Sequence, residues 1–73
     1  MSRWPILSGR KIVRALEKLG YYQVSQAGSH MRLRCDGRRS VTVPNYPAVS
    51  RGLLRKILRD AGLSPADFEK LLK

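Results

Sequence analysis

The sequence predicts an α+β domain in which two amphipathic helices pack on one face of a three-stranded antiparallel sheet. Two stretches of the chain carry apolar residues at helical spacing, and between them the apolar period changes to two. A chain of 73 residues has room for one such domain, 1–73, with a short C-terminal helix over 64–73. The expected order is therefore helix, three strands, helix and a helical tail.

The first helix is expected to begin after Ser8, a good N-cap residue, and to end at Gly20. Between them four apolar residues fall at i, i+3, i+4 and i+7: Ile12, Ala15, Leu16 and Leu19. Trp4 and Pro5 precede this helix, and they either fold over the core or belong to a mobile N-terminus spanning 1–6.

The middle strand, 30–35, divides into two faces because successive side chains of a strand alternate. Its inward residues are Met31, Leu33 and Cys35. Its outward residues are His30, Arg32 and Arg34. Residues 21–26 and 40–43 are expected to form the flanking strands, joined through a Gly28-Ser29 turn and an Asp36-Gly37 hairpin. In the first strand Tyr22 and Val24 share one side, and the other side takes Tyr21, Gln23 and Ser25.

The second helix is expected between the cap Ser50 and Gly62. Its apolar stripe is Leu54, Ile57, Leu58 and Ala61. A short last helix starts after Ser64 and offers Phe68, Leu71 and Leu72 for packing. Two helices can bury only one face of the sheet, so the face with His30 is left in solvent.

The charge balance points to a polyanionic partner. Lys and Arg number 15 against five Asp and Glu, which gives a formal net charge of +10. One cysteine cannot form an internal disulfide, and Cys35 with His30 is too small a set for a structural zinc site. No run approaches the roughly 20 apolar residues of a membrane span, so a cytoplasmic, nucleic-acid-binding protein with no membrane association is expected.

His30 is the only histidine in the chain. It is either a solvated side chain that hydrogen-bonds phosphate or a general base. A neutral imidazole could accept the proton of a ribose 2'-hydroxyl, while Arg32 or Arg34 stabilises the charge on the phosphorane. This chemistry needs no metal or other cofactor, and the scattered acidic residues do not form the carboxylate cluster of a two-metal nuclease. The leaving-group acid stays open between His30 itself, a lysine, a tyrosine and water.

The segments "LSGRKIVRALEKLGYYQVSQAGSHMRLR" and "SVTVPNYPAVSRGLLRKILRDAGLS" resemble the HicA (YcfA-like) family of bacterial toxins from type II toxin-antitoxin systems. The resemblance covers roughly residues 7 to 64. Its most specific features are the Gly-Ser-His triplet after a strand, the "VTVP" strand end and the "GLLRKILRDAGL" helix.

The resemblance implies a fold similar to double-stranded RNA-binding domains and ribosome-independent cleavage of messenger RNA with His30 as the catalytic residue. It also implies a HicB antitoxin that covers the active site in a hetero-oligomer, with the free toxin a monomer in the bacterial cytoplasm. Relatives often carry histidines where this chain has Asn45-Tyr46. Tyr46 is therefore a candidate for base stacking or antitoxin contact.

Eight further residues are candidates to bind RNA: Gly28, Ser29, Arg32, Arg34, Lys11, Arg14, Arg51 and Arg55. Arg51 follows Ser50 in a first helical turn, where free backbone N–H groups favour an anion. The alternatives are that the arginines and lysine only solubilise the surface and that Ser29 only makes the turn.

Three functions fit the charge. The first is a metal-independent endoribonuclease toxin that uses His30. The second is a non-catalytic RNA-binding module of the same fold, in which His30 contacts ribose or phosphate without cleavage. The third, a helix-turn-helix DNA binder built on 50–63, is weaker because a strand rather than a partner helix precedes that segment.

Overall fold

The computed structural model describes residues 6–73 and has the expected order of elements. The elements in chain order are α1 (Gly9–Leu19), β1 (Tyr22–Ala27), β2 (His30–Cys35), β3 (Arg38–Pro44), α2 (Arg51–Ala61) and α3 (Pro65–Leu71). The predicted α+β layout, helix then three strands then helix with a helical tail, is confirmed. The expectation for Trp4 and Pro5 concerns residues outside the described range.

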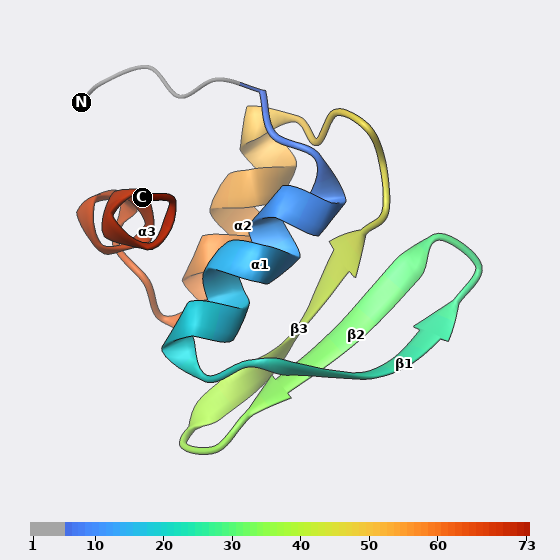
Figure 1. The fold of residues 1–73 in the computed structure, drawn as a ribbon, viewed down its shortest axis with the longest axis horizontal. Coiled ribbons are helices and arrows are strands. Elements are labelled where there is room, and N and C mark those ends of the chain that lie inside the picture. The colour runs from blue at the N-terminus through green and yellow to red at the C-terminus, as the bar shows by residue number, and fades with distance from the viewer. Residues whose placement is uncertain (1–5) are drawn as a thin grey trace.

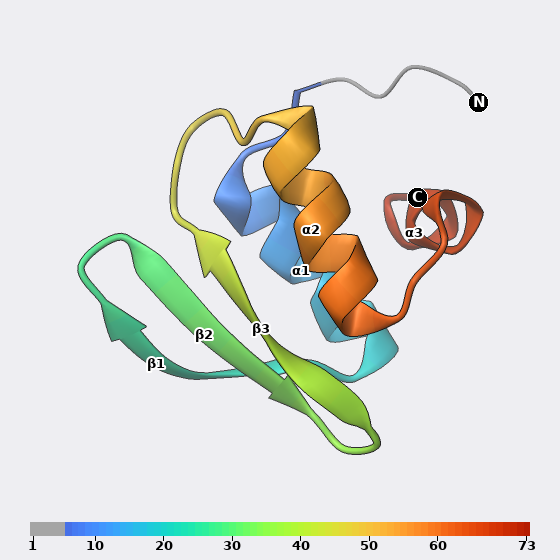
Figure 2. The same cartoon turned by 180° about the vertical axis from the view of Figure 1, so that it is seen from behind.

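The molecule has three layers, which Figures 1 and 2 show from opposite sides. The sheet forms one outer layer, α1 and α2 lie together against one of its faces, and α3 lies beyond them on the side away from the sheet. No described element covers the second face of the sheet. We call this second face the open face.

Each helix begins where the sequence predicts. At each start, a serine side chain accepts a hydrogen bond from a first-turn backbone N–H that has no carbonyl partner within the helix. The capping residues are Ser8, Ser50 and Ser64. The Oγ of each accepts a hydrogen bond of 3.1–3.2 Å from the backbone N–H of the residue three positions later. α1 and α2 end at Gly20 and Gly62, whose φ angles of 121° and 73° suit glycine.

The sheet is an antiparallel meander of order β1-β2-β3. Gln23 pairs with Leu33 and Ser25 pairs with Arg32, so Val24 is an extra residue in a bulge of β1. Since paired residues share a face, Ser25 lies on the open face. The strict alternation expected for 21–26, which put Ser25 with Tyr21 and Gln23, is therefore wrong beyond Gln23.

The core lies between the sheet and the helices. Its largest fully buried side chains come from α1, β2, β3 and α3: Ile12, Leu16, Leu33, Val43 and Phe68. The predicted apolar stripe of α2 is buried as well, whereas Leu19 and Cys35 are only partly buried. Burial of Phe68, worth roughly 2–3 kcal/mol, anchors the C-terminal helix to the rest of the domain. No helix in the range 6–73 is long and apolar enough to cross a membrane.

Candidate functional site

His30 is the first residue of β2 and is exposed to solvent. It pairs with Ala27 of β1 on one side and with Pro44 of β3 on the other. Met31 and Leu33 are buried on the opposite face, and Arg32 and Arg34 are exposed. The predicted orientation of β2 is confirmed, and the imidazole lies on the open face with both arginines.

Backbone groups hold the turn before His30, together with the side chain of Gln26, whose Nε2 donates to the Gly28 carbonyl at 3.0 Å. Gly28 has a φ of 58°, which favours glycine even though a side chain there would meet no atom within 4 Å. The Ser29 carbonyl accepts a hydrogen bond from the Asn45 backbone N–H. This bond joins the β1–β2 turn to the loop after β3, which lies next to it at the upper right of the sheet in Figure 1.

The same loop is bound to the start of α1. The Gly9 backbone N–H donates to the Tyr46 carbonyl at 2.9 Å, and a Cβ on Gly9 would lie only 1.9 Å from the Pro44 carbonyl oxygen. Val49 N–H donates to the Leu7 carbonyl at 2.8 Å. The His30 turn is thus connected through Asn45 and Tyr46 to the first turn of α1, and its side chains are left free.

The open face carries cations and polar groups beyond His30. Arg32 lies between its partners Ser25 and Thr42, and Arg34 pairs with Tyr22. All five side chains are exposed. Alternate residues of a strand are about 6.6 Å apart. His30, Arg32 and Arg34 therefore form a row along β2 that can contact successive groups of one extended ligand.

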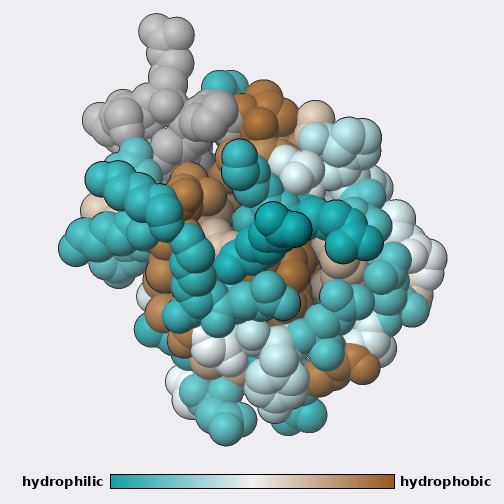
Figure 3. Space-filling model, viewed as in Figure 1, coloured by the Kyte–Doolittle hydropathy of each residue, from teal (hydrophilic) through white to brown (hydrophobic). Residues whose placement is uncertain are grey.

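Two predicted RNA-binding residues, Lys11 and Arg14, lie in the helical layer instead. They line a hollow of about 420 Å³ between α1 and α3, together with Ser8, Arg10, Ala15, Lys18, Leu71 and Leu72. Figure 3 shows hydrophilic side chains extending over this side of the molecule, with hydrophobic surface between them. The structure does not bring Lys11 onto the open face.

Arg10 and Arg14 also line a smaller hollow of about 130 Å³ against Gln23 and Met31. Arg10 thus lies next to β1 and β2, although the sequence did not indicate it as a site residue. Its position in the first turn of α1 is the only signal that could have indicated it.

Arg51 and Arg55 lie one turn apart on the exposed side of α2. Arg51 is the first residue of the helix, directly after the cap Ser50. The helix that carries these two arginines packs on the face of the sheet opposite to the open face (Figure 2).

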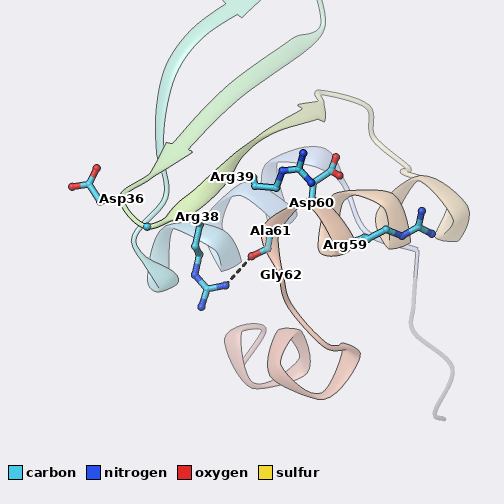
Figure 4. Close-up of a pocket in the computed structure, with 8 residues that line it drawn as sticks. Asp36, Arg38, Arg39, Arg59, Asp60, Ala61 and Gly62 are labelled. Carbon is cyan, nitrogen blue, oxygen red and sulfur yellow. Dashed lines mark hydrogen bonds between the residues drawn. The ribbon is translucent and has the colours of Figure 1, made fainter.

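Another hollow, of about 620 Å³, is at the Asp36-Gly37 hairpin end of the sheet (Figure 4). Its charged lining residues are Asp36, Arg38, Arg39, Arg59 and Asp60. Arg38 crosses from β3 to α2, where its Nη1 donates to the Ala61 carbonyl at 2.7 Å. Arg38 thus has a structural role, since it binds a carbonyl of the last turn of α2, and this hollow is separate from the site at His30.

Among residues 6–73, no three histidine, cysteine or acidic side chains lie close enough together to hold a metal ion. Cys35 is a half-buried free thiol at the far end of β2 from His30.

A model of the family described as HicA toxin of bacterial toxin-antitoxin matches residues 9–63. The chain belongs to the HicA toxin family. The matched range starts at the first residue of α1 and includes the whole sheet and α2. It ends before α3, so the C-terminal helix of this HicA chain lies outside the family match.

One solved structure with the same fold is a toxin-antitoxin complex from Streptococcus pneumoniae. The similar chain in it has 24% sequence identity and a TM-score of 0.69, and the match covers 78% of this HicA chain and 98% of that one. No protein of curated function has a significantly similar sequence. The family match therefore supports the toxin role, and the solved structure supports the fold.

Proposed function

We propose that this HicA toxin is a metal-independent endoribonuclease that cleaves messenger RNA with His30 as the general base. The observation that carries the proposal is the exposure of the chain's one imidazole on the open face, in a row with Arg32 and Arg34. A histidine kept for packing would lie with Met31 and Leu33 on the covered face.

In the proposed reaction, His30 takes the proton from a ribose 2'-hydroxyl. The 2'-oxygen then forms a bond to the adjacent phosphorus, and the bond from phosphorus to the 5'-oxygen breaks. The products are a 2',3'-cyclic phosphate end and a 5'-hydroxyl end. Arg32 or Arg34 stabilises the additional negative charge of the phosphorane, which is the usual role of a guanidinium in such a step.

The 5'-oxygen leaves with a proton. The imidazolium formed at His30 can return one, which makes His30 both base and acid. A second candidate is Tyr46, a residue 41% exposed in the loop whose Asn45 N–H donates to the Ser29 carbonyl. A lysine or water completes the set of possible donors.

We propose a HicB-like antitoxin as the partner that neutralises the toxin by covering the open face, in the bacterial cytoplasm. The net charge of +10 favours an acidic partner. Salt should weaken such a complex, because ions screen exposed charges.

The deciding experiment compares the wild-type protein with His30→Ala and His30→Gln. Cleavage of a long RNA should fall by about 10²–10⁴-fold, the usual contribution of one acid-base group. The melting temperature and the RNA affinity should be retained, and growth arrest on induction should disappear. EDTA should leave wild-type cleavage unchanged.

Growth arrest by His30→Ala would overturn the assignment of His30. Wild-type protein that binds RNA but never cleaves it, once freed of antitoxin, would favour the RNA-binding module. Loss of cleavage in EDTA would instead indicate a metal-dependent reaction.

A further inference from the structure

We propose that the open face binds RNA as a single strand laid along β2, with Tyr22 stacking on an unpaired base at the end of the row opposite His30. The proposal rests on the proposed function and specifies its substrate as single-stranded. It assigns a role to Tyr22, which neither the motifs nor the family match indicated.

The geometry of the sheet sets the length of this binding surface. Its three cross-strand rows start at His30 with Ala27 and Pro44, continue at Arg32, and end with Arg34 beside Tyr22. His30 and Arg34 are four residues apart, or about 13 Å along the strand. A stacked strand rises about 3.4 Å per nucleotide and an extended one rises more, so this distance corresponds to roughly two to four nucleotides.

Two adjacent tyrosines show that Tyr22 is not part of the core. Tyr21 is buried and its hydroxyl donates to the Arg39 carbonyl at 2.8 Å. Tyr22 faces the other way and is 48% exposed on the open face, beside the guanidinium-bearing Arg34. An aromatic ring next to a cation on a bare sheet surface can stack on a base while the cation contacts phosphate.

The charge distribution favours a polyanion on this face. All five acidic residues lie outside the strands, at Glu17, Asp36, Asp60, Asp67 and Glu69. The exposed partners of Arg32 are neutral, Ser25 and Thr42. A phosphate backbone along β2 would therefore meet no carboxylate from any strand.

A single strand fits these features better than a duplex does. The faces of paired bases are stacked inside a duplex, so Tyr22 could not reach one. Attack by the 2'-oxygen also requires it to align with the bond that breaks, and an unpaired backbone can rotate to reach that alignment. Both requirements favour an unpaired segment between His30 and Tyr22.

The test measures binding directly in the His30→Ala background, so that cleavage cannot obscure it. The probe is a 12-nucleotide fluorescent RNA of mixed sequence without self-complementarity, used alone and annealed to its complement. The single strand should bind at least about ten-fold more tightly than the duplex. Adding Tyr22→Ala should weaken single-strand binding by about 5- to 150-fold, the range for loss of one stacked base.

Two further substitutions separate stacking from burial of apolar surface. Tyr22→Phe keeps the ring and should bind within two-fold of the parent. Tyr22→Leu removes the ring and should weaken binding nearly as much as Tyr22→Ala. Val24→Ala is the matched control, since Val24 is 46% exposed in the same strand, and it should change affinity less than two-fold.

Equal affinity for duplex and single strand would overturn the proposal, and so would an unchanged dissociation constant for Tyr22→Ala. Either result could occur while the wild-type protein still cleaves RNA through His30. Conversely, if RNA binding depends on Tyr22 but the wild-type protein never cleaves RNA, the proposed binding surface is supported and the proposed catalysis is refuted. Melting curves of each variant check that the exposed substitutions leave the fold intact.

Discussion

The two ends of β2 are stabilised in different ways. At the His30 end, the main contacts join backbone groups: Asn45 N–H to the Ser29 carbonyl, and Gly9 N–H to the Tyr46 carbonyl. At the opposite end, around the Asp36-Gly37 hairpin, the contacts use side chains. Arg38 donates to the Ala61 carbonyl and the Tyr21 hydroxyl donates to the Arg39 carbonyl.

This difference favours the His30 end as the place of the proposed chemistry. At the hairpin end, Arg38 and Tyr21 are held in place by hydrogen bonds to backbone carbonyls. Backbone contacts at the His30 end leave His30, Ser29 and Tyr46 exposed while holding their positions. The hairpin end contains the hollow of about 620 Å³, yet two polar side chains at this end, Arg38 and Tyr21, already make structural hydrogen bonds.

The largest expected effect comes from Gly9→Ala, which disrupts the His30 end. The new Cβ would lie 1.9 Å from the Pro44 carbonyl oxygen, and that backbone atom can move only if the loop moves. We expect a loss of about 3 kcal/mol in the free energy of unfolding, measured by urea denaturation. Cleavage measured on the folded fraction should fall as well, because the loop also positions the Ser29-His30 turn.

Gly52→Ala is the matched control for Gly9→Ala. Gly52 is an exposed helical residue of α2, and a Cβ there would meet no atom within 4 Å. The same chemical change should therefore stabilise the protein by about 0.5–1 kcal/mol. Equal effects at the two glycines would contradict the tight contact between α1 and the loop.

An intermediate effect is expected for Arg38→Ala at the hairpin end. The substitution removes the charged side chain that donates to the Ala61 carbonyl in the last turn of α2. Its loss should cost about 1–2 kcal/mol of stability. Cleavage by the folded protein should not change, since Arg38 is at the end of the sheet opposite to His30. Arg59→Ala removes the same charge from the same hollow and should shift the urea midpoint much less. A large loss of cleavage with Arg38→Ala would show that the two ends are coupled.

The smallest effect is expected for Tyr21→Phe, which deletes one hydroxyl and its hydrogen bond and should cost about 1 kcal/mol near neutral pH. Burial raises the pKa of the Tyr21 phenol above its ordinary value of 10.0, with the thiol of Cys35 adding to the increase. The unfolded chain therefore loses this proton at a lower pH than the folded protein does. Stability should fall as the pH rises above about 10.

The Phe variant lacks this titration, so the stability difference between the two proteins should shrink in that alkaline range. Urea midpoints measured from pH 8 to pH 11 check the sign. A difference that grows above pH 10 would contradict the assignment of the shift to Tyr21.

Local signals in the sequence were sufficient to predict most of the fold. Serine caps and terminal glycines define the helices within a few residues of chain, and simple alternation places His30 on the open face. The bulge at Val24 could not be predicted, because it depends on how β1 pairs with β2. Ser25 was consequently assigned to the wrong face.

The candidate site was predictable only in part. The Gly28-Ser29-His30 triplet is contiguous, so its position on a turn followed from the sequence. The bonds from Gly9 to Tyr46 and from Asn45 to Ser29 join segments far apart in the chain, and no local pattern encodes them. For the same reason the sequence could not separate Arg32 and Arg34 from the four other cations predicted to bind RNA, which lie on the helices: Lys11, Arg14, Arg51 and Arg55.

The composition of β1 has a practical consequence for handling the free protein. This strand borders the sheet, its six residues are exposed, and none of them is charged. Edge strands usually carry lysine or another charged residue that prevents edge-to-edge association. In β1 only the bulge at Val24 interrupts the regular edge. Mutual repulsion between molecules of net charge +10 must provide the remaining protection. Concentrated salt would remove that repulsion, so purification in dilute buffer should keep the toxin from self-associating.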